Sequence, residues 1–170
     1  MKKIMFKDTV GLTRAVLRRE KTMTRRNSDM YEVGEEVAIA MSYKSMANGG
    51  YLKQMMEGPL KFKKEYTGAG WKNKMYVKAE LMPRRVRILR KWQERLQDIS
   101  DEDCMKEGIM EGNFRNTWDR YYYQTWGDVP NAVTFRTPRE AFASLIDRVS
   151  GKGTWDSNPL VWCYEFELID

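Results

Sequence analysis

The sequence predicts an α+β fold built on a mostly antiparallel sheet, and three observations support this class. Residues 160–168 are apolar or aromatic at every even position, as in a strand with one buried face. Capping signals open two helices, one at Ser100 and one at Thr137. Strands and helices do not alternate regularly along the chain, so a parallel α/β fold is not indicated.

Shorter apolar or alternating runs predict the other strands. They lie at residues 3–6, 37–41, 75–81 and 86–89. In 75–81 the odd positions are apolar and the even positions are polar or aromatic, and Pro83 separates this run from the next. The stretch 42–70 is rich in Gly and Lys and is expected to be mainly loop, with some helix around 52–56.

Three helices are expected. The first runs from residue 8 or 9 to about 19, although Gly11 weakens it. The second is short and spans 100–107, where Ser100 precedes an acidic first turn and Gly108 can close the helix. The third spans 137–150, because its opening combines a Thr cap, a Pro and a Glu three residues after the cap.

Length and composition indicate a single domain over residues 1–170 in the cytoplasm. A chain of 170 residues is typical of one domain. No run approaches the roughly 18 apolar residues of a membrane span, and the basic opening lacks the apolar core of a signal peptide. Two cysteines, Cys104 and Cys163, are too few for a disulfide framework, which favours a reducing compartment.

The chain contains no histidine. Histidine-based triads, histidine general bases and histidine-containing zinc sites are therefore excluded. Two cysteines cannot complete a structural zinc site, and no glycine-rich phosphate loop is present, so we expect neither a metal nor a cofactor. Any catalysis must use Lys, Asp, Glu, Ser, Thr, Tyr, Cys or Arg.

Charge is distributed unevenly along the chain. Residues 1–95 carry a net charge of +13 and residues 96–170 carry −7, which together give the total of +6. A positive face could attract phosphates, and the alternative is a solvated surface with ion pairs across the chain. In 61–95, Tyr66, Trp71, Tyr76 and Trp92 stand among twelve cations; they could stack bases or simply anchor the core. The aromatic residues of 114–126 are expected to form a satellite core.

A basic segment, 18–26, follows the first predicted helix. If the chain turns there, Lys21 and Thr24 can share a pocket, where burial beside other cations would lower the pKa of the lysine and make it a base. Arg25 and Arg26 suit phosphate or carboxylate oxygens. The alternative is a solvated basic turn at a helix end. Glu107 stands at the end of the second helix, where a carboxylate is unfavourable, and this position hints at another use.

Several blocks together resemble the ASCH-domain proteins, a branch of the PUA-like superfamily, in the larger forms found in bacteria and phages. The matching blocks are Lys21-Thr22-Met23-Thr24-Arg25-Arg26, Tyr31-Glu32-Val33-Gly34-Glu35, Leu81-Met82-Pro83-Arg84, residues 94–103, and Trp155 with Asn158-Pro159-Leu160-Val161-Trp162. The resemblance implies a small, partly open, mostly antiparallel β-barrel decorated by helices. On that basis 44–74 and 108–136 are insertions.

The resemblance implies binding of RNA, or of a modified nucleoside or nucleotide, in a basic cleft. The residues expected to bind nucleic acid are Lys21, Arg25, Arg26, Arg84 and Arg85. A smaller branch of similar proteins hydrolyses N4-acylated cytidine nucleosides with a Lys, a Thr three residues later and a Glu, which correspond here to Lys21, Thr24 and Glu107. This amidohydrolase is the alternative function, and a phage-type accessory protein that binds a protein partner is a third.

Overall fold

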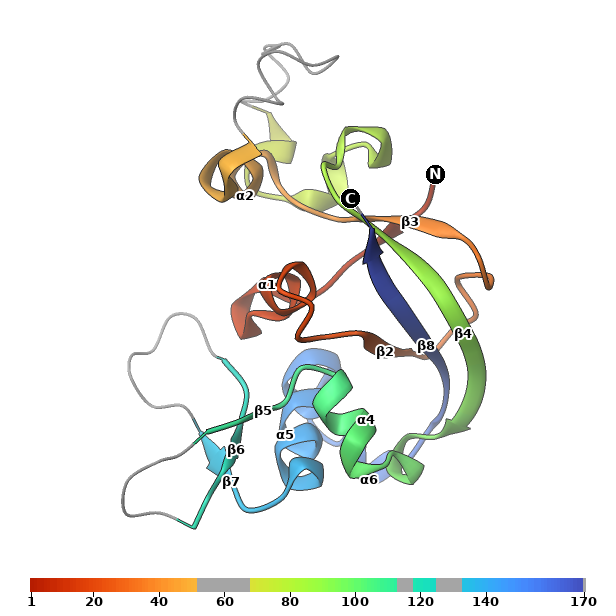
Figure 1. Ribbon diagram of the computed structural model, residues 1–170, viewed down its shortest axis with the longest axis vertical. Coiled ribbons are helices and arrows are strands. Elements are labelled where there is room, and N and C mark those ends of the chain that lie inside the picture. The colour runs from red at the N-terminus through yellow and green to blue at the C-terminus, as the bar shows by residue number, and fades with distance from the viewer. Residues whose placement is uncertain (52–67, 113–117, 125–132, 170) are drawn as a thin grey trace. The chain divides into compact units, whose positions relative to one another are not determined.

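The computed structural model describes residues 1–51, 68–112, 118–124 and 133–169 (Figure 1). The chain divides into two compact units. The first contains residues 1–6, 36–87 and the C-terminal end, and the second contains residues 7–35 and 88–168. The predicted helix around 52–56 and the residues Tyr66, Phe114 and Trp126 lie outside the described residues.

The first unit is built on three strands. β1 (Lys3–Ile4) pairs in parallel with β3 (Glu36–Ile39), and β3 pairs antiparallel with the start of β4 (Arg85–Arg95), with Val37 opposite Val86. The inward side chains of these strands are fully buried and form the core of the unit. The short helix α2 (Tyr43–Met46) follows, with Ser42 as its N-cap. A turn of π type (Ala47–Tyr51) continues from α2, and a 3₁₀ turn spans Ala69–Trp71.

The predicted strand at 75–81 is wrong, because this segment forms two 3₁₀ turns, Lys74–Tyr76 and Ala79–Leu81. The side chain of Asn73 caps the first turn by accepting from the amide of Met75. The ammonium of Lys3 donates to the carbonyls of Met75 and Val77, at 2.9 and 2.7 Å. These carbonyls therefore bond a side chain instead of a neighbouring strand, and the alternating sequence does not become a ladder.

The second unit carries the remaining strands and most of the helices. The rest of β4 lies beside β8 (Leu160–Ile169), which pairs antiparallel with β2 (Met23–Arg26). The helices are α1 (Leu12–Leu17), α4 (Asp101–Lys106), α5 (Pro138–Ser150) and α6 (Thr154–Ser157), with 3₁₀ turns at Asp8–Val10 and Leu96–Asp98. A small sheet consists of β5 (Met110–Glu111), β6 (Tyr121–Tyr122) and β7 (Thr134–Phe135).

The α+β class is confirmed, whereas closure into a barrel is not. The strand order is β1-β3-β4 in the first unit and β4-β8-β2 in the second. β1 and β2 stand at the two ends of this order, so the described strands form an open sheet. No described helix has the length and apolar character needed to cross a membrane.

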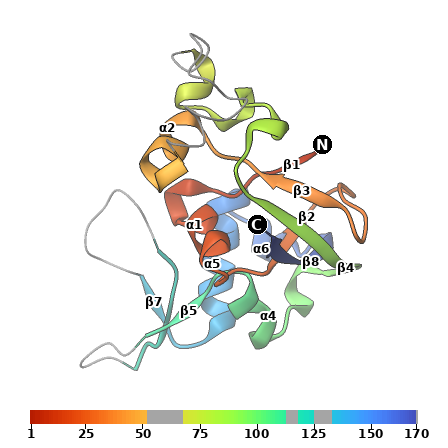
Figure 2. The same cartoon turned by 45° about the horizontal axis from the view of Figure 1, so that its top comes forward.

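The two capped helices are confirmed by their side-chain bonds. The Ser100 hydroxyl accepts from the amide of Asp103 at the start of α4, and Thr137 forms a complete capping box with Glu140 at the start of α5. α4 and α5 pack side by side, as Figures 1 and 2 both show. The predicted helix 8–19 is shorter than expected, because Gly11, at φ +67°, separates a 3₁₀ turn from α1.

The predicted strand at 160–168 is confirmed. Its odd positions were expected to face solvent, but in the first half of the strand they are buried. Val161 and Cys163 are buried, and Glu165 is only partly exposed. The reason is that the Cys163 side of β8 faces a cluster of charged side chains in the interior, namely Arg25, Glu94 and Glu107. The predicted satellite core is present in part: Tyr123 is buried and stacks on Phe135, whereas Trp118 is exposed.

Candidate functional site

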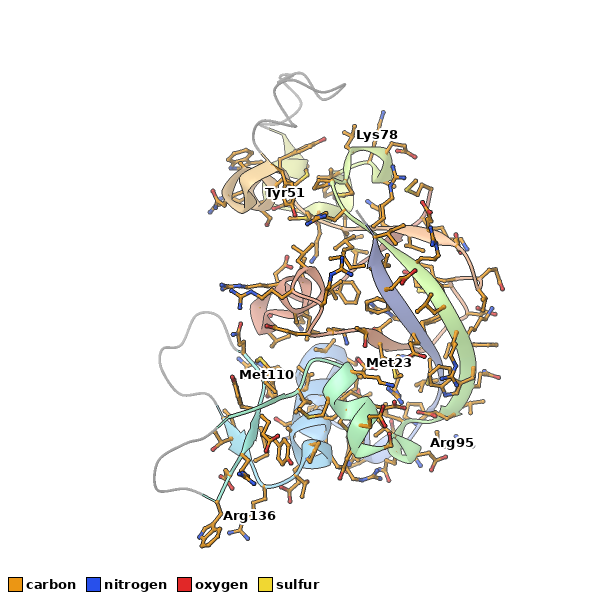
Figure 3. The ribbon with its side chains drawn as sticks, in the orientation of Figure 1. Met23, Tyr51, Lys78, Arg95, Met110 and Arg136 are labelled. Carbon is orange, nitrogen blue, oxygen red and sulfur yellow. The ribbon has the colours of Figure 1, made fainter. Side chains whose placement is uncertain are left out.

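The second unit buries a group of charged side chains next to β2. This ion-pair cluster consists of Lys21, Arg25, Glu94, Asp103 and Glu107. Lys21 comes just before β2 and Arg25 lies within it, in the strand that Met23 marks in Figure 3. Lysine and arginine are seldom buried unless paired, so the arrangement is a candidate site.

The centre of the cluster is the contact between Lys21 and Glu107. The Lys21 ammonium donates to Glu107 Oε2 at 2.5 Å and to the Glu107 backbone carbonyl at 2.7 Å. Lys21 is 2% exposed and Glu107 is 5% exposed. Two residues singled out in the sequence, 86 positions apart, are thus in direct contact.

Glu107 reaches Lys21 because the chain reverses at the end of α4. Glu107 is the C-cap of α4, and Gly108 follows at φ +102°, a backbone conformation that favours glycine. A Cβ at Gly108 would lie 3.3 Å from Leu12 Cδ2 and 3.6 Å from Lys21 Cδ, so a larger residue would crowd this site. The amide of Thr22 donates to the Lys106 carbonyl at 2.9 Å and ties the two segments together.

Arg25 connects Glu107 to a second carboxylate. Its Nη1 donates to Glu107 Oε1 at 3.0 Å, while Nε and Nη2 both donate to Glu94 Oε1, the former at 3.2 Å. Asp103 Oδ2 lies 3.5 Å from Nη2. The remaining oxygen of Glu94 accepts from the indole nitrogen of Trp92 at 2.9 Å. The Arg25 guanidinium is therefore occupied by protein carboxylates.

These contacts shift the pKa values in directions that geometry explains. Burial is the largest influence on Lys21; together with the charges of Arg26 and Arg25 it outweighs the attraction of Glu107, and the pKa of Lys21 is lowered from 10.5. Partial burial opposes ionisation of Glu94, but the hydrogen bonds from Trp92 and Arg25 hold its pKa below 4.5. A lysine with a lowered pKa and a carboxylate partner is equipped for proton transfer.

Thr24, the third predicted catalytic residue, is buried in the same strand, opposite Tyr164 of β8. Successive residues of a strand project to opposite faces, so the Thr24 side chain lies on the other face of β2 from Arg25. Within the described part of the chain, the Thr24 hydroxyl makes no hydrogen bond to protein. The hydroxyl is therefore available to a water or a ligand, whereas the Lys21 ammonium is occupied by Glu107.

The residues predicted to bind nucleic acid are divided between the two units. Lys21 and Arg25 are buried in ion pairs with carboxylates. Arg26 lines a pocket of about 130 Å³, together with Asn27 and other residues of the second unit. In the first unit, Arg84 donates to the hydroxyl of Tyr51, and Arg85 lies 3.7 Å from Glu36 on an exposed ladder.

A larger pocket, of about 310 Å³, also borders Lys21. Most of the surface that lines it is apolar. The lining residues come from α1, from the segment between α1 and β2, from β4 and from the end of β8. The residues are Val16, Arg19, Lys21, Thr22, Leu89, Glu165, Phe166, Glu167 and Leu168. A concave, mainly apolar space with a few charged groups is typical of a small-molecule site.

Sequence reasoning missed the roles of Glu94 and Trp92. Both stand at even positions of β4, the set that includes the buried Val86 and Ile88. A carboxylate on the inward face of an amphipathic strand was the available signal, because such a group requires a partner. Asp103 was interpreted only as a helix-start acid, and in the structure it also contacts Arg25.

Comparisons with protein-family models, with curated proteins and with solved structures find no match to this chain. Among the described residues, no group of three or more Cys, Asp or Glu side chains is arranged to hold a metal ion. The site must therefore be interpreted from its own chemistry.

Proposed function

We propose that this chain is an amidohydrolase that acts on N4-acylated cytidine-type nucleosides, with Lys21, Thr24 and Glu107 at its site. The observation that carries the proposal is the contact of the buried Lys21 ammonium with Glu107 at 2.5 Å, together with the lowered pKa of Lys21. The motif resemblance to the nucleoside-hydrolysing branch of ASCH-domain proteins supplies the substrate class.

The chemistry follows from the roles of the three side chains. The attacking oxygen is that of Thr24, or of a water held by its hydroxyl, and it adds to the carbonyl carbon of the acyl group. Lys21, in its neutral form, accepts the proton released by the attacking oxygen. Lys21 passes that proton to the Glu107 carboxylate, which delivers it to the leaving N4 nitrogen as the C–N bond breaks. Attack by the water gives the carboxylic acid and the free cytidine amine directly. Attack by Thr24 gives the free amine and an acyl-threonine ester, which a water then hydrolyses to release the carboxylic acid and restore the hydroxyl.

The pocket of about 310 Å³ offers room for such a substrate beside Lys21, the one proposed catalytic residue that lines it. Apolar side chains such as Leu89 and Phe166 suit an acyl group or the face of a base. Arg19, at the same pocket, donates to the carbonyl of Leu168 at 3.0 Å and holds the end of β8 there.

Binding of RNA or a nucleotide is the second candidate, and Arg26 is the residue that favours it. Arg26 lines the smaller pocket with Asn27, Ser150 and Thr154, whose polar side chains suit a phosphate or a base edge. Lys21 and Arg25 support this candidate less, because protein carboxylates already neutralise their charges.

The test is hydrolysis of N4-acetylcytidine by the purified protein, followed by chromatography of the released cytidine. We expect turnover by the parent and a loss of about 100-fold or more in Lys21→Met, Thr24→Val and Glu107→Gln. Matched controls are Lys106→Met and Thr9→Val, a lysine and an exposed threonine that line neither pocket, which should keep turnover within about threefold. Circular dichroism checks that each variant folds.

Two outcomes overturn the proposal. One is a parent that releases no cytidine from any acyl nucleoside tested. The other is turnover that survives in the folded Thr24→Val and Lys21→Met proteins. In either case, titration with single-stranded RNA at several salt concentrations tests the binding candidate, which requires affinity to fall steeply with salt.

A further inference from the structure

Arg25 stands between two carboxylates of the ion-pair cluster and touches only one of the proposed catalytic residues. It holds Glu107 Oε1 at 3.0 Å, while Lys21 holds Oε2 of the same carboxylate at 2.5 Å. Each oxygen of Glu107 thus has its own cation. Arg25 therefore fixes the rotation of the carboxylate about its last bond and takes part of its negative charge.

Glu94 partly neutralises the positive charge of Arg25 and so weakens the attraction between Arg25 and Glu107. It accepts from two nitrogens of Arg25 through one oxygen, and its other oxygen accepts from Trp92. The contacts form a continuous chain from Trp92 through Glu94, Arg25 and Glu107 to Lys21. A change at the Glu94 end must alter the electrostatic field at Lys21.

We infer that Arg25 is a positioning residue for Glu107, and that Glu94 balances Arg25 and thereby sets the proton affinity of Lys21. Arg25 is then not a ligand for phosphate, in contrast to the expectation from the sequence. The inference rests on the proposed function in one respect, namely that Lys21 and Glu107 transfer protons to and from a substrate.

The inference takes account of the ionisable groups in the cluster and in the pocket beside Lys21. In and around the cluster they are Arg25 and Arg26 from β2, Glu94 from β4, Asp103, Cys104 and Glu107 from α4 and its C-cap, and Cys163 from β8; in the pocket they are Arg19, Glu165 and Glu167. Burial raises the pKa of each thiol to about 12, so both cysteines stay neutral near pH 7. On the cluster side of Lys21, two arginines therefore oppose three carboxylates, while Arg19, Glu165 and Glu167 of the pocket are the same in every variant.

The arrangement predicts opposite effects of two substitutions on the proton affinity of Lys21. Arg25→Gln removes a cation and leaves Glu107 to Lys21 alone, so the pKa of Lys21 rises. Glu94→Gln removes the negative charge that offsets the charge of Arg25. The net positive charge near Lys21 then increases, so the pKa of Lys21 falls. Arg25→Lys keeps the charge and should keep the midpoint of Lys21, but it loses the planar fork and lowers turnover.

The experiment is a pH titration of ¹³C-lysine-labelled protein, in which the Cε signal of Lys21 is identified by its absence in Lys21→Met. We expect the midpoint to move by more than about 0.5 pH units, a threefold change in proton affinity, upward in Arg25→Gln and downward in Glu94→Gln. Glu102→Gln is the control, because Glu102 lies on the same helix as Asp103 but pairs with Lys106 on the surface; it should leave the midpoint unchanged.

An unchanged midpoint in both variants, or movement in the same direction, overturns the inference. If Arg25→Gln does not fold, Glu94→Gln still decides it, because Glu94 is partly exposed and its amide is nearly isosteric. The titration needs no turnover, so a parent without hydrolase activity would refute the proposed function while Arg25 is still tested. The pH profile of turnover in the active parent and in Glu94→Gln should show the same downward movement.

Discussion

Replacement of Glu107 by Gln removes the one negative charge that Lys21 and Arg25 share. Both cations then remain buried, and Arg25 keeps two carboxylate partners, Glu94 and Asp103. Lys21, 2% exposed, keeps the Glu107 backbone carbonyl as an acceptor and has a neutral amide oxygen in place of the carboxylate. Breaking a buried pair by removal of one partner typically costs about 3–5 kcal/mol.

The ordinary pKa of lysine sets an upper limit on this cost. The buried Lys21 can lose its proton instead of staying charged, and at pH 7 this costs about 5 kcal/mol relative to an unfolded lysine of pKa 10.5. In the variant, the folded state then binds one proton fewer than the unfolded state. Its stability therefore rises by about 1.4 kcal/mol per pH unit as the pH increases from 7.

The assay is urea denaturation of the parent and of Glu107→Gln between pH 7 and pH 10, followed by tryptophan fluorescence. We expect a loss of about 3–5 kcal/mol at pH 7. The loss shrinks as the pH rises, up to the pH at which Lys21 of the parent also loses its proton. Glu102→Gln is the control, and because that pair is on the surface its loss should stay below about 1 kcal/mol.

A loss below about 1 kcal/mol at pH 7 would show that Lys21 and Glu107 are not in contact in a dry interior. A large loss that does not change with pH would refute the deprotonation of Lys21, and with it the argument that burial dominates the proton affinity of this lysine.

Two further predictions concern the acid side and the helix that packs against α4. The pKa of Glu94 is lowered in the folded state, so the stability that its ionised form contributes is complete above pH 4.5 and is lost as the pH falls through the folded value. Glu94→Gln should be about 1–3 kcal/mol less stable than the parent at pH 7. Denaturation at pH 3 should show a smaller difference between the two proteins. Thr137→Ala removes the side-chain half of the capping box of α5 and should cost about 1 kcal/mol by thermal denaturation, while Thr134→Ala outside the helix should cost less.

Local signals predicted the elements well where the partners are close in the chain. The starts of α4 and α5 depend on hydrogen bonds between residues three positions apart, Ser100 with Asp103 and Thr137 with Glu140. Such bonds form within one helical turn whatever the rest of the molecule does. The strand at 75–81 failed for the opposite reason, because its backbone carbonyls bond Lys3, more than 70 positions away.

The amino-acid sequence alone established the α+β class, the helix starts of α4 and α5, the absence of histidine chemistry and the choice of Lys21, Thr24 and Glu107 as residues to examine. The tertiary structure decided which of these side chains meet. It placed Lys21 against Glu107 and Arg25 between Glu107 and Glu94, and it left Thr24 on the alternate side of its strand. These contacts depend on how α4, β2 and β4 pack, and packing is set by the whole core, so no short stretch of sequence encodes it.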